Sequence, residues 1–191
     1  MPSSADAFDA AIERAADAVR DAVASLDPQT PPIVLIDGQS GSGKTTLAAR
    51  LRAQWTGEVQ IVALDDIYPG WDGLAAGSDR ARTQILDPIR RGRTAHWHRW
   101  DWALSAPGEA VATHPDVALI VEGSGILTEA SAALAPVRVW LESPEAARRE
   151  RALARDGETY RPHWQRWADQ EARHLDVDEP RGLATIVVDV P

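Results

Sequence analysis

The chain contains no cysteine among its 191 residues. Disulfide bonds, thiolate nucleophiles and cysteine-based zinc sites are therefore excluded. The sequence also lacks any apolar run approaching the roughly 20 residues that a membrane-spanning helix needs. Its first 26 residues are acidic and rich in alanine, unlike the basic and then apolar segments of a signal peptide. From these absences we expect a cytoplasmic protein that does not bind membranes.

Positive charge is scarce, because 20 lysine and arginine residues face 29 aspartates and glutamates, for a net charge of −9. This balance argues against an extended surface for nucleic acid or anionic lipid, so we expect no nucleic-acid partner. The length and the hydrophobic content of 44% fit one globular domain over residues 1–191. A homo-oligomer stays open, because the amphipathic segment 4–26 could pack on its own sheet, which we favour, or on a neighbour.

Lysine occurs only once, whereas arginine occurs 19 times. The single lysine lies in a complete G-x-x-x-x-G-K-[ST] motif, preceded by the apolar run 33–36 and followed by the helical pattern 45–51. In such a loop the backbone N–H groups and the start of the next helix bind phosphates. We therefore predict a nucleoside triphosphate site built from Gly38, Ser40, Gly41, Ser42, Gly43, Lys44, Thr45 and Thr46.

The motif also assigns roles and excludes several classes of protein. Lys44 is expected to reach the β- and γ-phosphates, and the Thr45 hydroxyl is placed to bind Mg²⁺. A Ras-like Asn-Lys-x-Asp motif would need a second lysine, and the Leu-Ser-Gly-Gly-Gln signature of ABC-type ATPases is absent. Motor and AAA-type ATPases usually end a strand in Asp-Glu, whereas here Val121 leads into Glu122 and Gly123. The exclusion of these three classes favours an enzyme that transfers a phosphoryl group to a small molecule.

Apolar runs at 33–36, 59–64, 117–121, 137–141 and 185–190 are typical of buried strands. Helical spacing marks the segments 79–91, 144–155 and 160–175, as well as an N-terminal helix within 1–28. Alternating strands and helices predict an α/β fold of three layers, with a five-stranded parallel sheet covered by helices on both faces. We expect the tryptophan-rich insert 92–113, either an irregular loop or a hairpin, to cover the site.

Carboxylates follow two of the predicted strands. Asp65 and Asp66 come directly after the run 59–64, and Glu122 ends the run 117–121. The carboxyl ends of parallel strands form the ligand-binding edge of such a sheet. Transfer of a phosphoryl group to an alcohol needs a carboxylate to accept the hydroxyl proton and acidic groups to hold Mg²⁺. These three residues are therefore candidates, with Glu122 and Asp66 as metal ligands and the adjacent pair as the source of the base.

The motifs together resemble the uridine kinase/phosphoribulokinase/pantothenate kinase group of P-loop kinases. The resemblance is carried, in order and spacing, by the loop 38–45 and by Asp65-Asp66-Ile67-Tyr68, Trp100-Asp101-Trp102 and Val121-Glu122-Gly123. It covers roughly residues 30–160 and is greatest with the uridine kinase branch. It implies a P-loop NTPase fold, for which we predict the strand order 2-3-1-4-5, and the use of ATP rather than GTP.

The resemblance also implies individual roles. Asp65 would be the catalytic base, Glu122 would help to hold Mg²⁺, and Tyr68 would contact the acceptor. The segment Trp100-Asp101-Trp102 matches an acceptor-binding element, although packing against the core explains the two tryptophans equally well. We also expect Trp71 near the acceptor.

Arginines gather on one predicted helix. Arg148, Arg151 and Arg155 share a face by their spacing of three and four residues. In the resembled kinases this helix is a lid, here 144–158, whose arginines clamp the transferred phosphoryl group. The alternative is a solvated face paired with Glu145 and Glu150.

The sequence thus predicts an ATP- and Mg²⁺-dependent kinase that phosphorylates a hydroxyl of a small-molecule acceptor, most readily a nucleoside. Two alternatives stay open. One is an ATP-binding regulatory switch without a small acceptor. The other is a kinase for a different metabolite, such as pantothenate or a sugar phosphate.

Overall fold

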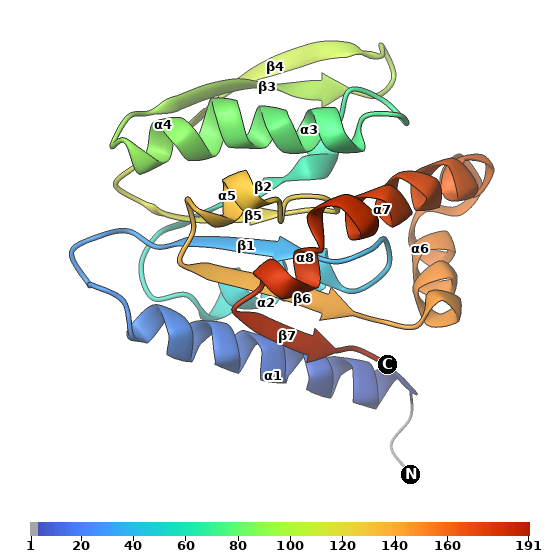
Figure 1. The fold of residues 1–191 in the computed structure, drawn as a ribbon, viewed down its shortest axis with the longest axis horizontal. Helices are drawn as coiled ribbons and strands as arrows, with labels where there is room; N and C mark the ends of the chain where they lie inside the picture. The colour runs from blue at the N-terminus through green and yellow to red at the C-terminus, as the bar shows by residue number, and fades with distance from the viewer. Residues whose placement is uncertain (1–3) are drawn as a thin grey trace.

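The computed structural model of the protein describes residues 4–191, so the first three residues of the predicted N-terminal segment lie outside it. Five parallel strands form the main sheet in the order β2-β5-β1-β6-β7 (Figure 1). The strands are β1 (Ile33–Asp37), β2 (Val59–Ala63), β5 (Ala118–Glu122), β6 (Val137–Glu142) and β7 (Ile186–Asp189). Counted along the chain within this sheet, the order is 2-3-1-4-5. The predicted fold class and strand order are confirmed.

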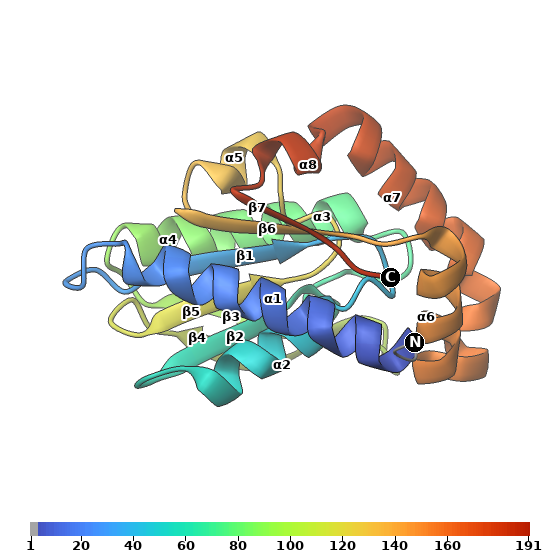
Figure 2. The same ribbon diagram turned by 90° about the horizontal axis from the view of Figure 1, so that it is seen from below.

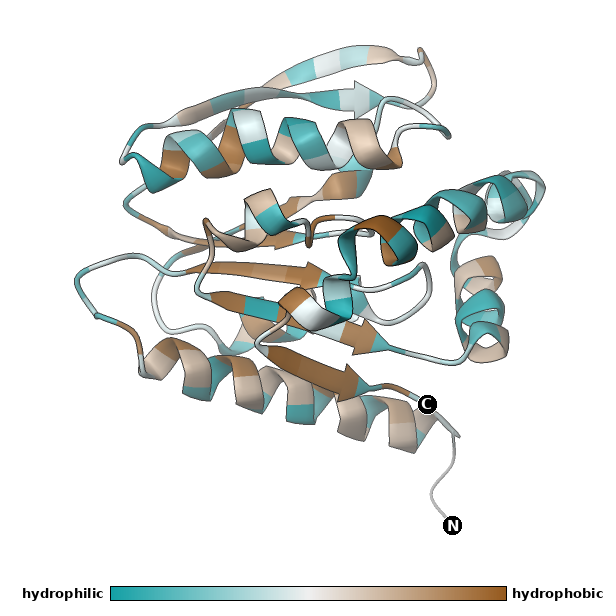
Figure 3. Ribbon diagram, viewed as in Figure 1, coloured by the Kyte–Doolittle hydropathy of each residue, from teal (hydrophilic) through white to brown (hydrophobic). Residues whose placement is uncertain are grey.

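The central strand β1 explains why its sequence is a continuous apolar run. All five of its residues are buried, because helices cover both faces of the sheet. Val34 and Ile36 face one hydrophobic core, whereas Ile33 and Leu35 face the other. The apolar colouring of β1, β6 and β7 contrasts with the mixed colouring of the helices in Figure 3. The sheet therefore separates two cores and presents one carboxyl edge.

One face of the sheet is covered by α1 (Ser4–Ala24) and α2 (Lys44–Gln54) (Figure 2). Ile12 and Val19 of α1 are fully buried in the core that also holds Leu47 and Leu51 of α2. The amphipathic segment near the N-terminus thus packs on its own sheet, as we favoured.

The opposite face is covered by several other helices. These are α3 (Leu74–Arg80), a π-helical segment (Ala81–Leu86) and α4 (Asp87–Arg90), followed further along by α5 (Glu129–Ala132), α7 (Trp164–Asp178) and α8 (Pro180–Leu183). The first three form one continuous helical run that corresponds to the predicted helix 79–91 but begins earlier. Gly77 is the reason that its start was missed in the sequence, because glycine weakens a helical pattern. Here the missing Cβ lets the Tyr68 ring pack closely.

The tryptophan-rich insert is an antiparallel hairpin of β3 (Ala95–Asp101) and β4 (Ala106–Thr113), lying over α3 and α4 at the top of Figure 1. Trp97 points inward and is buried in the core. The predicted 144–155 helix is α6 (Glu145–Tyr160), which is broken at Gly157 by φ 56° and ψ −136°. A short 3₁₀ turn (Arg161–His163) then leads into α7.

Within residues 4–191, no helix combines the length and apolar character needed to cross a bilayer.

Candidate active site

A cavity of about 830 Å³ opens at the carboxyl edge of the sheet, where the loops after β1, β2 and β5 meet. This volume lies within the usual range for small-molecule sites, roughly 300–1,000 Å³. Its lining combines the phosphate loop, the two strand-end carboxylates, aromatic rings and two arginines. The lining includes Ser40, Gly41, Gly43, Lys44, Thr45, Thr46, Asp65, Tyr68, Trp71, Trp102, Glu122, Ser124, Arg151, Arg155, Asp156, Thr159, Tyr160 and Trp167.

The loop 38–45 joins β1 to α2, and its backbone conformation depends on glycine. Gly41 has φ +79° and Gly43 has φ +106°, a region that other residues rarely adopt. A Cβ on Gly41 would also lie 2.1 Å from the backbone oxygen of Arg148. Most of the predicted nucleotide-binding residues line the cavity, whereas the loop residues Gly38 and Ser42 are buried and are not part of its lining.

Lys44 lies at the floor of the cavity with only 9% of its surface exposed. Its Nζ donates to the backbone oxygen of Gly38 at 2.7 Å and also contacts Gln39 O and Ser124 Oγ, each at 3.2 Å. The ammonium group is therefore held in place by the loop itself. Ser124, which no sequence motif indicated, completes this arrangement from the segment after β5.

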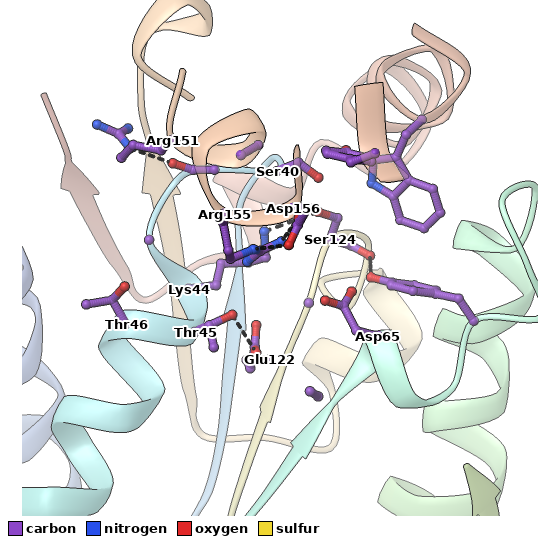
Figure 4. A pocket seen from close by; sticks show the side chains of 18 of the residues that line it. Ser40, Lys44, Thr45, Thr46, Asp65, Glu122, Ser124, Arg151, Arg155 and Asp156 are labelled. Carbon is purple, nitrogen blue, oxygen red and sulfur yellow. Dashed lines mark hydrogen bonds and ion pairs between the residues drawn. The ribbon is translucent and has the colours of Figure 1, made fainter. Parts of the chain in front are cut away.

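Thr45 and Glu122 meet at the start of α2. The Thr45 hydroxyl donates to Glu122 Oε1 at 2.9 Å (Figure 4). Burial raises the pKa of Glu122, while the nearby charge of Lys44 and the hydrogen bond from Thr45 act in the opposite direction. A hydroxyl and a carboxylate side by side form an oxygen donor set that suits Mg²⁺. The residues present therefore fit the predicted metal.

The side chains of the adjacent residues Asp65 and Asp66 have different surroundings. Asp65 lines the cavity and is exposed to solvent there. Although the side chain is open to the cavity, desolvation by the protein around the cavity raises the pKa of Asp65 above the ordinary 3.8, and the charges of Lys44 and Arg155 oppose the shift. Asp66 instead forms an ion pair with Arg99 of the hairpin at 3.3 Å. Asp66 is not part of the cavity lining, so the predicted metal role is not supported by its position.

Aromatic residues form the wall beyond Asp65. The Tyr68 hydroxyl donates to the backbone oxygen of Ser124 at 2.7 Å. Trp71 and Trp102, which are predicted acceptor contacts, line the cavity, and the Trp102 indole N–H donates to the backbone oxygen of Asp65 at 2.9 Å. This bond ties the hairpin to the strand-end loop that carries Asp65.

Two predicted acceptor contacts do not reach the cavity. Asp101 turns into the hairpin loop, where its Oδ1 accepts from the backbone N–H groups of Ala103 and Leu104, each at 2.9 Å. Trp100 is half-buried and also lies outside the lining. Side-chain directions can be read from sequence spacing only while a strand is regular. Here the register shifts between His98 and Trp100, and β3 ends at Asp101, so spacing did not predict where Trp100 and Asp101 point.

The three predicted lid arginines have separate environments. Arg155 lines the cavity and pairs with Asp156 at 2.7 Å (Figure 4). Arg151 also lines it and donates to the backbone oxygen of Gly41 at 2.8 Å. Arg148 is buried outside the cavity, where it donates to the backbone oxygens of Ser143 and Ser40 at 3.0 and 3.2 Å. Arg148 thus supports the loop, and only Arg151 and Arg155 can reach a ligand.

Sequence reasoning missed a buried polar network that α7 brings to the loop. Glu171 Oε1 accepts from the Ser40 backbone N–H at 2.6 Å, from Ser124 Oγ at 2.9 Å and from the Trp167 indole at 3.1 Å. His174 Nε2 lies 3.1 Å from Asp37 Oδ2. The sequence feature that could have indicated this network is the pair Glu171 and His174. These polar residues are spaced by three on the helix face that also carries tryptophans.

The sequence matches no model of a protein family and no curated protein. The fold, by contrast, is shared with solved structures that are described as kinases. A structure described as a possible uridine kinase from Bacillus stearothermophilus superimposes with a TM-score of 0.66 at 18% identity, over 92% of this chain and 98% of that one. The D-glycerate 3-kinase from Cryptococcus neoformans gives 0.52 at 14% identity, over 94% and 95%.

Proposed function

We propose that this protein is an ATP- and Mg²⁺-dependent kinase that transfers the γ-phosphoryl group to a hydroxyl of a small molecule, most readily a nucleoside. One observation carries the proposal: Asp65 shares a single cavity with the phosphate loop and with an aromatic wall. The loop offers a place for the triphosphate, the wall a place for the acceptor, and the carboxylate lies between them.

The nucleotide would be bound chiefly by the loop. Its backbone N–H groups and the Lys44 ammonium would bind the phosphates, and the start of α2 adds the positive end of its dipole. Thr45 and Glu122 would hold Mg²⁺, which when bound neutralises charge on the phosphates. Among the described residues no group of three or more His, Asp or Glu could hold a metal ion. The remaining Mg²⁺ ligands would therefore come from the nucleotide and water.

The transfer step follows from the position of Asp65. The acceptor hydroxyl oxygen would form a bond to the γ-phosphorus as the bond to the β,γ-bridging oxygen breaks, and ADP would leave. Asp65 would accept the hydroxyl proton, and its raised pKa makes the carboxylate a better base. Arg151 and Arg155 lie where they could stabilise charge on the transferred group.

The aromatic wall favours an acceptor with a ring that can stack, which supports a nucleoside over an open-chain alcohol. A regulatory ATP-binding switch would have no use for such a wall next to a carboxylate.

The proposal is tested by ADP release from Mg·ATP in the presence of nucleosides, pantothenate, sugars or sugar phosphates, each compared with no acceptor. Release that depends on a nucleoside supports the full proposal. Release that depends on another alcohol retains the kinase and replaces the acceptor. Slow release independent of every acceptor would contradict the kinase proposal and favour the switch.

A further inference from the structure

The N-terminal helix α1 reaches the active-site cavity through Phe8, which is the only phenylalanine in the sequence. Phe8 and Ile12 lie one helical turn apart, and both approach the position that a Cβ on Gly43 would occupy. Ile12 Cδ1 lies 2.9 Å from that position, and Cε2 and Cζ of Phe8 each lie 3.2 Å from it. Ile12 is fully buried, whereas Phe8 is half-buried and lines the cavity. The apolar stripe of α1 therefore ends in an aromatic ring beside the phosphate loop.

Arg151 covers one face of this ring. The guanidinium carbon lies 4.9 Å from the centroid of the Phe8 ring, which is the geometry of a cation–π contact. Every nitrogen of the guanidinium also donates to a protein oxygen, in Gly41, Ser143 and Pro191. Arg151 is thus fixed in place and holds the ring, so a ligand would meet the remaining surface of the ring that lines the cavity.

The position of the ring fits the base of a bound nucleotide. Thr46 and Arg151 lie on one side of Lys44, and Asp65 lies on the other side (Figure 4). A nucleotide whose γ-phosphate lies beside Asp65 therefore extends over Lys44 and the start of α2 towards Phe8 and Arg151. The other aromatic rings of the lining contact one another in the wall beyond Asp65, on the acceptor side.

We propose that Phe8 forms the nucleobase end of the nucleotide site, so that the base of the bound nucleotide packs against this ring of α1. The inference rests on the proposed function for the identity of the ligand, and it adds to the site a helix that no sequence motif assigned to it. A planar base gains contact area on an aromatic ring at little cost in conformational entropy. The loop would bind the phosphates and α1 the base, so the two contributions can be measured separately.

The test compares Mg·ATP with the Mg²⁺ complex of inorganic tripolyphosphate, which has the phosphates but neither sugar nor base. Calorimetric titration gives both Kd values for the wild type and for Phe8→Ala. We expect Phe8→Ala to raise the Kd of Mg·ATP at least about tenfold and to change that of tripolyphosphate less than about twofold. Equal weakening of both ligands would show that Phe8 only supports Gly43 and the loop, and would overturn the inference. An unchanged Kd of Mg·ATP would also overturn it.

Two further variants separate stacking from a general loss of packing. Phe8→Leu keeps an apolar side chain beside Ile12 but removes the aromatic ring. We expect it to weaken Mg·ATP binding while thermal unfolding stays close to that of the wild type, and wild-type affinity for Mg·ATP would contradict stacking. Val23→Ala is the control, because Val23 packs on the same core near the other end of α1 and lies outside the lining. A loss of Mg·ATP affinity in Val23→Ala equal to that in Phe8→Ala would overturn the inference.

The same titrations distinguish failure of the inference from failure of the proposed function. A wild-type protein that binds neither Mg·ATP nor tripolyphosphate would overturn the nucleotide site and this inference with it. A wild-type protein that binds Mg·ATP and transfers its phosphoryl group, with unchanged affinity in Phe8→Ala, would overturn the inference alone.

Discussion

The Glu171 carboxylate and the Ser40 backbone N–H lie 2.6 Å apart, although 131 residues separate them in sequence. The same carboxylate oxygen accepts from Ser124, which contacts Lys44, and from Trp167, which lines the acceptor side of the cavity. One buried side chain of α7 therefore connects the phosphate loop with the aromatic wall. Helix α7 thus contributes to the site even though it lies far in sequence from every recognised motif.

Removal of this carboxylate should destabilise the protein. Glu171→Ala removes the acceptor of the Ser40 backbone N–H and of the Trp167 indole, and it removes the carboxylate that lies 4.0 Å from the buried Arg148 guanidinium, so we expect the free energy of unfolding to fall by about 3 kcal/mol. Denaturant titration measures this change. Asp169→Ala is the control, because Asp169 lies exposed on the same helix and accepts from the exposed Gln165 side chain. It should change stability by no more than about 0.5 kcal/mol. Similar losses of unfolding free energy in both variants would show that the hydrogen bonds of Glu171 do not stabilise the fold.

The single lysine allows a direct test of nucleotide binding. An amine-reactive reagent can modify only Lys44 and the α-amino group, so mass spectrometry assigns the product without ambiguity. Because Lys44 is predicted to contact the phosphates, saturating Mg·ATP should slow its modification at least about tenfold. Modification of the α-amino group provides the internal control. An unchanged rate at Lys44 would place the nucleotide elsewhere.

His174 should make folding stability depend on pH. Burial alone would lower its pKa, but the hydrogen bonds and charges of Asp37 and Asp178 together raise it above the ordinary 6.5. The folded state therefore binds the proton more tightly than the unfolded state. The resulting stabilisation is fully present below pH 6.5 and is lost as the pH rises through the higher folded value.

Urea titrations from pH 5.5 to 9 should therefore show a decline in wild-type stability that begins near the ordinary pKa of histidine. His174→Gln should be less stable at the acidic end and should lack this part of the slope. The same slope in both proteins would assign the pH dependence to other groups.

Gly77 should influence acceptor binding through Tyr68. Alanine ordinarily stabilises a helix relative to glycine, by about 1 kcal/mol. At this position, however, an added Cβ would lie 2.4 Å from Cδ1 of the Tyr68 ring. We expect Gly77→Ala to raise the KM for the acceptor several-fold while the affinity for Mg·ATP stays unchanged. Gly182→Ala is the control, because no atom lies within 4 Å of its added Cβ. An unchanged KM for the acceptor in Gly77→Ala would show that the position of the Tyr68 ring does not affect acceptor binding.

The sequence was sufficient for the features that depend on local pattern. The phosphate loop needs a strand, two glycines and a helix in immediate succession. The apolar runs alternate with helical segments clearly enough to predict a parallel sheet, and the resemblance to P-loop kinases supplied its strand order. The pair Asp65 and Asp66 was identifiable as a candidate because residues directly after a parallel strand lie at the ligand-binding edge. The choice of Asp65 between the two came from the resemblance.

Side-chain direction and long-range partners were not predictable in the same way. Asp66 is adjacent to Asp65, yet one turn of 3₁₀ helix sends it towards Arg99. Arg148 shares a helix face with Arg151, but the close approach of the loop buries it. Nothing near Glu171 in sequence shows that α7 reaches Ser40, because that contact depends on how the whole fold packs.

The most direct test of the account is acceptor-dependent ADP release by Asp65→Asn, with Asp66→Asn as the matched control. Loss of the base should lower kcat by about 100- to 10,000-fold, whereas Asp66→Asn should stay within a few-fold of the wild type. Nucleotide binding, followed by Mg·ATP titration, should remain nearly intact in both variants. Near-normal turnover in Asp65→Asn, or an equal loss in Asp66→Asn, would contradict the assignment of Asp65 as the base.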